Sequence, residues 1–171
     1  LDVFKGQSLR LMIDLPNDVD IVDFFIHNLS VKRLVASTAG DGFIVPEAEI
    51  VAQTRSGRQV LNVKGDVKAL LAQPVTGDHV ACVGENRKVL VFSLDELPEM
   101  GRGKGVRLQK YKDGGLSDAT TFAIQEGLAW KDPAGRTRTV EQAELLEWTG
   151  KRASAGRMAP RGFPRDNRFT K

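Results

Sequence analysis

Hydrophobic residues along this chain occur in short runs that alternate with turn-forming residues. The runs are rich in valine, isoleucine, phenylalanine and threonine, and clusters of glycine, aspartate, asparagine and proline separate them. Such alternation is typical of short strands joined by tight turns, whereas few segments show the 3.6-residue period of an amphipathic helix. The pattern therefore predicts an all-β fold.

Three stretches resemble one another in their order of strand, polar turn and strand. They cover residues 34–46, 80–92 and 128–140, and glycine, asparagine or aspartate lies in each turn. This turn chemistry predicts three β-hairpins. A short segment of acidic and apolar residues follows each hairpin, at 47–50, 94–97 and 141–145.

A second feature recurs between the hairpins. Residues 8–13, 59–63 and 105–109 alternate apolar and polar positions, and each follows a stretch of glycine and basic residues. Repeats of roughly 40–50 residues with about four strands apiece are the signature of propeller blades. We expect three blades, at approximately 6–50, 57–97 and 103–145, followed by a basic terminal segment at 146–171.

Three blades are fewer than the roughly 4–8 of a closed propeller. Either the chain is a fragment of a larger ring, or a second copy completes the ring. The chain does not begin with methionine, and this favours the fragment.

The net charge of +3 over 171 residues conceals a gradient along the chain. Residues 1–50 carry 4 basic and 8 acidic groups, residues 51–100 carry 6 of each, and residues 101–171 carry 15 basic and 8 acidic groups. A segment with net charge +7 favours a polyanion or an acidic surface as its partner.

Other residues limit the possible functions. The single cysteine, Cys82, can form no internal disulfide, which fits the cytoplasm. One cysteine and two widely separated histidines exclude a Cys/His zinc site, and no apolar run approaches the ~18 residues of a membrane span. No nucleophile, acid pair or ligand cluster indicates catalysis, so we expect no catalytic residue, metal or cofactor in this chain.

The segment 101–105, Gly-Arg-Gly-Lys-Gly, superficially resembles a phosphate-binding glycine loop. A dinucleotide fingerprint needs a helix after the glycines, but an alternating strand follows here, and no Gly-Lys-Ser/Thr occurs. Two interpretations remain open. The segment is either a tight turn between blades or a turn that presents Arg102 and Lys104 to a phosphate backbone.

Several stretches together resemble a known family. The Arg/Gly-rich segment 101–106, with 83–89, 111–118 and 159–164, is similar to the C-terminal domains of bacterial type IIA topoisomerases, and specifically of the ParC subunit of topoisomerase IV. The resemblance implies a propeller-like β-pinwheel, whose blades exchange strands, with a basic rim that binds and bends DNA. It also implies that the catalytic tyrosine, the Mg²⁺ and ATP sites lie elsewhere in the parent enzyme, an ATP-dependent type II DNA topoisomerase that forms a heterotetramer with its ATPase subunit, ParE.

The chain departs from the fuller Gln-Arg-Arg-Gly-Gly-Lys-Gly box of the gyrase subunit. It has only the shortened segment at 101–105 and more divergent counterparts at 54–58 and 151–157. This departure favours the topoisomerase IV role, in which a non-catalytic domain presents DNA for decatenation and relaxation on the cytoplasmic chromosome.

The candidate DNA-binding residues are basic side chains of the turns, blade junctions and terminal segment. They are Arg55, Arg58, Arg87, Lys88, Arg102, Lys104, Arg107, Lys110, Arg152, Arg157, Arg161 and Arg165. The alternative interpretation is a propeller-type interaction module that binds an acidic protein. Strand alternation further predicts that Arg87 and Lys88 face solvent, and that Cys82, Val89 and Val91 are buried.

Overall fold

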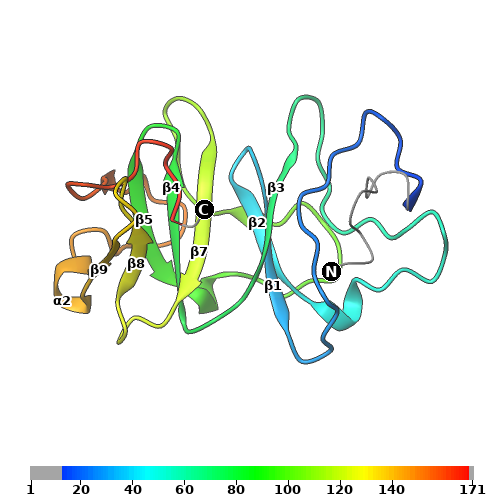
Figure 1. The fold of residues 1–171 in the computed structure, drawn as a ribbon, viewed down its shortest axis with the longest axis horizontal. Coiled ribbons are helices and arrows are strands. Elements are labelled where there is room, and N and C mark those ends of the chain that lie inside the picture. The colour runs from blue at the N-terminus through cyan, green and yellow to red at the C-terminus, as the bar shows by residue number, and fades with distance from the viewer. Residues whose placement is uncertain (1–12, 170–171) are drawn as a thin grey trace.

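Three antiparallel hairpins form the framework of the molecule (Figure 1). The structure is a computed structural model that describes residues 13–169. All three hairpins predicted from the turn chemistry are confirmed, and so is the all-β fold. The hairpins are β1 (Lys32–Ser37) with β2 (Asp41–Pro46), β4 (His79–Gly84) with β5 (Lys88–Ser93), and β8 (Leu128–Lys131) with β9 (Thr137–Val140).

The acidic-apolar segment after each hairpin turns the chain away from the sheet. The first two segments form 3-10 helices, η2 (Glu47–Glu49) and η3 (Leu94–Glu96), and the third forms a short α-helix, α2 (Gln142–Leu145). Each of these turns begins directly after the second strand of its hairpin or one residue later. The repeated sequence pattern therefore corresponds to a repeated local structure.

Two of the hairpins gain outer strands from later parts of the chain. β3 (Ala69–Pro74) pairs with β1, and β7 (Leu116–Phe122) pairs with β4. The two-residue strands β6 (Val106–Arg107) and β10 (Arg157–Met158) pair with β2 and β5. The sheet orders are thus β3-β1-β2-β6 and β10-β5-β4-β7, and each sheet combines strands from different repeats.

The connecting strands are shorter than the alternating sequence predicts. Residues 105–109 contribute only the two-residue strand β6, and residues 59–63 contribute a single bridge, between Leu61 and Gly103. Of the stretch predicted at 8–13, residues 8–12 lie outside the described residues. Each connection pairs briefly with one neighbour before it turns to the next, because the strand exchange divides it between blades.

The strand exchange repeats with the same geometry in both sheets. At the edge of β2, Ile44 N–H donates to Pro98 O at 3.0 Å and Ile44 O accepts from Met100 N–H at 2.8 Å. At the edge of β5, Val91 N–H donates to Trp148 O at 2.8 Å and Val91 O accepts from Gly150 N–H at 2.9 Å. The segments 98–100 and 148–150 are therefore equivalent edge strands.

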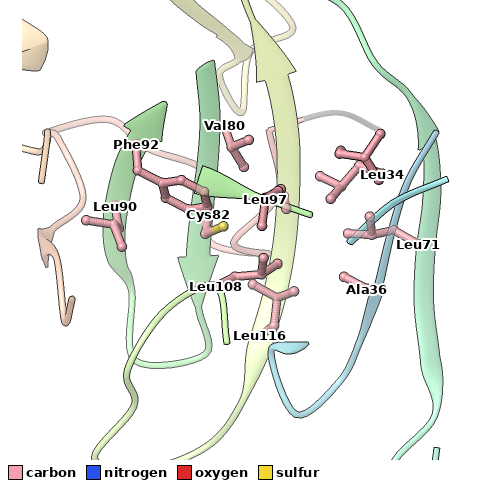
Figure 2. Close-up of a cluster of buried hydrophobic side chains, with 12 residues drawn as sticks. Leu34, Ala36, Leu71, Val80, Cys82, Leu90, Phe92, Leu97, Leu108 and Leu116 are labelled. Atoms are coloured by element: carbon pink, nitrogen blue, oxygen red, sulfur yellow. The ribbon is translucent and has the colours of Figure 1, made fainter. Parts of the chain in front are cut away.

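Both faces of the β10-β5-β4-β7 sheet are covered, so its two central strands, β4 and β5, are buried along almost their whole length. Along β4, Val80 and Cys82 face one hydrophobic cluster, and Ala81 and Val83 face another. The first cluster fills the space between the sheets of β1 and β4, and Figure 2 shows Cys82 and Phe92 on the β4 side of it and Leu34 and Leu71 on the β1 side. Burial on two faces favours continuous apolar strands, as observed here.

The buried positions agree with the predicted strand alternation. Cys82 and Val91 have no exposed surface, and Val89 is 2% exposed, as expected. Burial raises the pKa of the Cys82 thiol far above its ordinary value. Among residues 13–169, no helix has the length and hydrophobicity that a membrane-crossing helix requires.

Candidate nucleic-acid interface

Three basic segments follow the three hairpins and the short helical turns after them. We call residues 54–62 the first junction, residues 101–110 the second and residues 151–157 the third. They contain eight of the twelve candidate DNA-binding residues. These eight are Arg55, Arg58, Arg102, Lys104, Arg107, Lys110, Arg152 and Arg157.

The first and second junctions are in direct contact. Gly103 N–H donates to Val60 O at 2.9 Å, and Gly103 O accepts from Asn62 N–H at 2.8 Å. The guanidinium of Arg102 also reaches across, since its Nη2 donates to Gln59 Oε1 at 3.2 Å. These contacts place the cations of residues 55–58 and 102–104 in neighbouring loops.

The second and third junctions are joined in the same way. Ala153 N–H donates to Leu108 O and Lys110 N–H donates to Ser154 O, both at 2.9 Å. The Arg152 side chain adds a bond from Nη1 to Arg107 O at 2.7 Å. The three junctions therefore follow one another in order, and we call this arrangement the basic rim.

A glycine of the second junction is required by the backbone. Gly105 has a φ of 82°, and a Cβ at this position would collide with the backbone of Gly42. Only glycine combines that conformation with so close an approach. The approach allows β6 to pair with β2 directly after the loop. The turn interpretation of this segment is thus satisfied, and it leaves the side chains of the loop free for a second role.

The cations of the second junction are exposed and only weakly paired. Among the described residues, the Arg102 side chain hydrogen-bonds to Gln59 only, and the side chain of Lys104 is 74% exposed, with Nζ 3.6 Å from Asp41 Oδ2. Arg107 on β6 and Lys110 are exposed as well. A surface pair of this kind contributes little stability, so the charge of Lys104 remains available to a ligand.

The other two junctions differ in how firmly their cations are held. Arg55 and Arg58 are exposed, as is Arg157 on β10. Arg152 is half-buried, because its N–H donates to Glu96 Oε1 at 3.0 Å while its guanidinium binds Arg107 O. The geometry therefore assigns Arg152 to joining two junctions rather than to presenting charge.

The expectation that Arg87 faces solvent is wrong. Its Nη1 donates to Pro164 O and to Asn167 Oδ1, both at 2.9 Å, and its Nη2 donates to Phe163 O at 3.1 Å. The terminal segment thus covers the turn between β4 and β5. Lys88 is also half-buried.

The terminal candidates lie apart from the contacts that join the junctions. Arg161 and Arg165 are exposed, in the segment held by Arg87. Arg161 lines an open groove of about 940 Å³ together with Arg136 and Arg138 of the third hairpin. None of the hydrogen bonds described above joins either residue to the basic rim.

Sequence reasoning missed the charge cluster of the third hairpin. Asp132 is buried and accepts hydrogen bonds from the backbone N–H of Arg136 and Ala134 and from Nε of Arg136 and Arg138. The Arg136 N–H, followed by the Arg138 side chain, lowers the pKa of the Asp132 carboxyl. The alternation of Arg136 and Arg138 in a predicted strand was the available signal.

Comparison with known proteins decides the family. The family model described as DNA gyrase C-terminal domain, beta-propeller, matches residues 34–75 and 78–116. The DNA topoisomerase 4 A-subunit of Caulobacter vibrioides is 46% identical over 164 residues, which is 96% of this chain and 21% of that protein. The chain belongs to the family of ParC C-terminal domains of topoisomerase IV.

Further relatives agree with this family. The DNA topoisomerase 4 A-subunit of Rickettsia bellii is 41% identical over 96% of the chain and 22% of its own length. The chain therefore spans about a fifth of the length of these topoisomerase IV proteins. The resemblance predicted from the segments 83–89, 101–106, 111–118 and 159–164 is confirmed.

Solved structures support the propeller-like architecture. The C-terminal domain of Escherichia coli ParC aligns with a TM-score of 0.77 at 23% identity, over 94% of this chain and 69% of that one. A second C-terminal domain of DNA topoisomerase IV aligns with a TM-score of 0.69 at 20% identity, over 88% and 49%. At these identities the alignments show the fold alone.

Proposed function

We propose that this chain is a non-catalytic domain that binds and bends duplex DNA along the basic rim. The observation that carries the proposal is the contact of the three junctions in sequence order. The links between Gly103 and Val60 and between Ala153 and Leu108 join segments from separate repeats that carry exposed cations, which supports the proposal. Cations aligned in this way suit a phosphate backbone, which presents one charge per ~1.7 Å of duplex.

Within residues 13–169, the structure has no helix long enough to read base sequence as a recognition helix does. α2 has only four residues, and the rim cations lie on loops and two-residue strands. Contacts to phosphates position a protein on DNA without specifying bases. We therefore infer that the domain responds to the path of the duplex, and that bending brings successive junctions onto successive phosphates.

In the parent enzyme, this domain would present DNA segments for decatenation and relaxation. The strand-passing chemistry, with its Mg²⁺ and ATP, would belong to other domains and to the ATPase subunit, ParE. The proposed setting is the chromosome in the cytoplasm. Membership of the topoisomerase IV ParC family supports this assignment.

The test is duplex DNA affinity across a salt series for the chain and for the double variant Arg102→Ala/Lys104→Ala. Loss of two phosphate contacts lowers the slope of log affinity against log salt by roughly 2, for every DNA sequence alike. Thermal stability stays within about 0.5 kcal/mol, because both side chains are exposed. A folded double variant with the parental slope would remove the second junction from the DNA interface.

A further inference from the structure

In the part of the chain that the structure describes, the third hairpin has no edge strand like those of the other two hairpins. Segment 98–100 pairs with the edge of β2, and segment 148–150 pairs with the edge of β5. β8 and β9 form a sheet of two strands. Within residues 13–169, no segment is paired with the outer edge of β9.

The backbone groups on this edge follow from the hairpin register. Asp132 N–H donates to Arg136 O at 2.8 Å, and the next pairs along the ladder are Lys131 with Thr137 and Trp130 with Arg138. Hydrogen-bonded pairs alternate in an antiparallel ladder. Thr137 and Thr139 therefore direct their N–H and C=O groups away from β8, and no backbone partner for them exists in the described part of the chain.

An open groove of about 940 Å³ borders β9. Trp130, Arg136 and Arg138 of the hairpin line one side, and Trp148 and the segment 159–162, which includes Arg161, line the other. Two acids also line the groove, Asp132 and Glu144.

The charge of the groove favours an anionic ligand. Asp132 is already occupied, since it accepts two backbone N–H groups and the Nε atoms of Arg136 and Arg138. Among residues 13–169, the terminal guanidinium nitrogens of these two arginines and the whole guanidinium of Arg161 have no hydrogen-bond or ion-pair partner. Three exposed arginines thus face one unengaged acid, Glu144.

The segments seated on the equivalent edges show which chemistry fits. The seated residues are Pro98-Glu99-Met100 and Trp148-Thr149-Gly150, and each follows a short helical turn, η3 or α2, that carries further acids. In the first segment, Glu99 Oε2 lies 2.7 Å from Lys32 Nζ, and Met100 packs on the cluster of Phe43. The first seated strand thus joins an acid to a cation and packs an apolar residue beside it, and the second packs Trp148 against a hydrophobic cluster.

We propose that the edge of β9, together with the arginine groove beside it, binds an extended acidic-apolar peptide segment as an added β-strand. The backbone N–H and C=O groups of Thr137 and Thr139 form the hydrogen bonds to the added strand, as in other cases of strand addition. Arg136, Arg138 and Arg161 pair with the acids of the segment, and Trp148 offers a surface for its apolar residues.

The test uses a fluorescein-labelled peptide with the sequence of residues 94–100 and a matched peptide with glutamine and asparagine in place of its acids. Anisotropy titration is expected to show saturable binding of the acidic peptide and at least tenfold weaker binding of the neutral one. Arg161→Glu is expected to weaken acidic-peptide binding at least tenfold. The control Arg165→Glu has the same charge change outside the groove and is expected to leave peptide binding unchanged.

A second measurement reports strand addition itself. The peptide is expected to slow hydrogen exchange of the Thr139 amide, and Thr139→Pro, which removes that donor without touching the hairpin ladder, is expected to abolish binding. The proposal would be overturned if Arg161→Glu bound the peptide as tightly as the parent does. It would also be overturned if bound peptide did not slow hydrogen exchange of the Thr139 amide.

Two further outcomes would assign the groove to another ligand and so overturn the proposal. One is a tenfold loss of duplex DNA affinity in Arg161→Glu without any peptide binding. The other is concentration-dependent self-association in sedimentation that Arg161→Glu abolishes. Because Arg102→Ala/Lys104→Ala is expected to keep peptide binding, failure here is distinguishable from failure of the proposed DNA interface.

Discussion

A cation's role in this molecule depends on the backbone that carries it. Arg87 occupies the turn between β4 and β5 with a φ of 64°, a conformation that aims its side chain at the terminal segment. There the guanidinium donates to the carbonyl oxygens of Phe163 and Pro164. Arg102, by contrast, lies in an exposed loop, and within residues 13–169 its guanidinium hydrogen-bonds to Gln59 alone. Sequence alone could not separate these roles, because the partners of Arg87 lie at least 76 residues away.

Replacement of Arg87 by alanine is expected to release the terminal segment. The variant loses hydrogen bonds from a charged donor to Phe163, Pro164 and Asn167, at a cost of about 1–3 kcal/mol in the free energy of unfolding. Urea denaturation measures the loss, and faster hydrogen exchange of the Phe169 amide, which is bound to Asp118, locates it. Arg165→Ala is the control, and equal effects of the two substitutions would contradict the assigned role of Arg87.

Asp132 is expected to make the third hairpin sensitive to acid. Its carboxylate accepts four hydrogen bonds and its pKa lies below the ordinary value of 3.8, so ionised Asp132 stabilises the folded state. This contribution is present above pH 3.8 and is lost as pH falls through the lower folded value. Asp132→Asn is therefore expected to lower Tm at neutral pH and to converge on the parent below pH 3.8. A Tm difference that does not change with pH would refute the assignment.

At the scale of elements, local signals identified the hairpins and long-range pairing determined the rest. Each hairpin turn is encoded within a few residues, so turn chemistry sufficed to predict 34–46, 80–92 and 128–140. The partners of the strand edges are decided by other repeats, as when Gly150 bonds to Val91 across 59 residues of chain. The alternation of apolar and polar residues in 59–63 and 105–109 therefore predicted strands with one exposed face. It could not show how few residues of each strand would pair with a neighbour.

The edge segment 148–150 is expected to contribute stability through its backbone. A Cβ at Gly150 would meet Leu90 and Ser154 at ordinary contact distances, so Gly150→Ala is tolerated. Gly150→Pro removes the N–H that donates to Val91 O and leaves this buried carbonyl oxygen without its donor. The free energy of unfolding is therefore expected to be about 1–3 kcal/mol lower than that of the alanine variant. Chemical denaturation of the two variants gives the difference directly. Equal stability would show that this strand exchange does not hold the blades together.

At the scale of the whole molecule, the strand exchange and the basic rim have the same origin. A chain that crosses from one blade edge to the next must pass through a junction, and the backbone bonds of Gly103 and Ala153 fasten each junction to its neighbour. Segments that carry cations are thereby brought into contact with one another. The charge gradient along the sequence indicated a polyanion, but only the contacts between junctions show which basic segments are neighbours.

A continuous rim predicts that the junctions contribute additively to DNA binding. Three double variants each remove two exposed cations, namely Arg55→Ala/Arg58→Ala, Arg102→Ala/Lys104→Ala and Lys151→Ala/Arg157→Ala. Each is expected to lower the slope of log affinity against log salt by roughly 2, and any two combined by roughly 4, because the phosphate contacts are separate. The measurement uses one duplex long enough to reach all three junctions.

A terminal segment acting alone predicts a different result for the same variants. In that case the first two double variants leave the salt slope unchanged, whereas Lys151→Ala/Arg157→Ala and Arg161→Ala/Arg165→Ala, which both lie within residues 146–171, lower it. A rim that binds DNA at one junction at a time predicts a third result. In that case each double variant changes the DNA affinity and the salt slope only slightly, because another junction binds the DNA instead. If all junctions contact DNA at the same time, each double variant lowers the salt slope by an equal step while every variant keeps the parental Tm. This result would distinguish a continuous DNA path from the other two models, because only simultaneous phosphate contacts contribute additively to the slope.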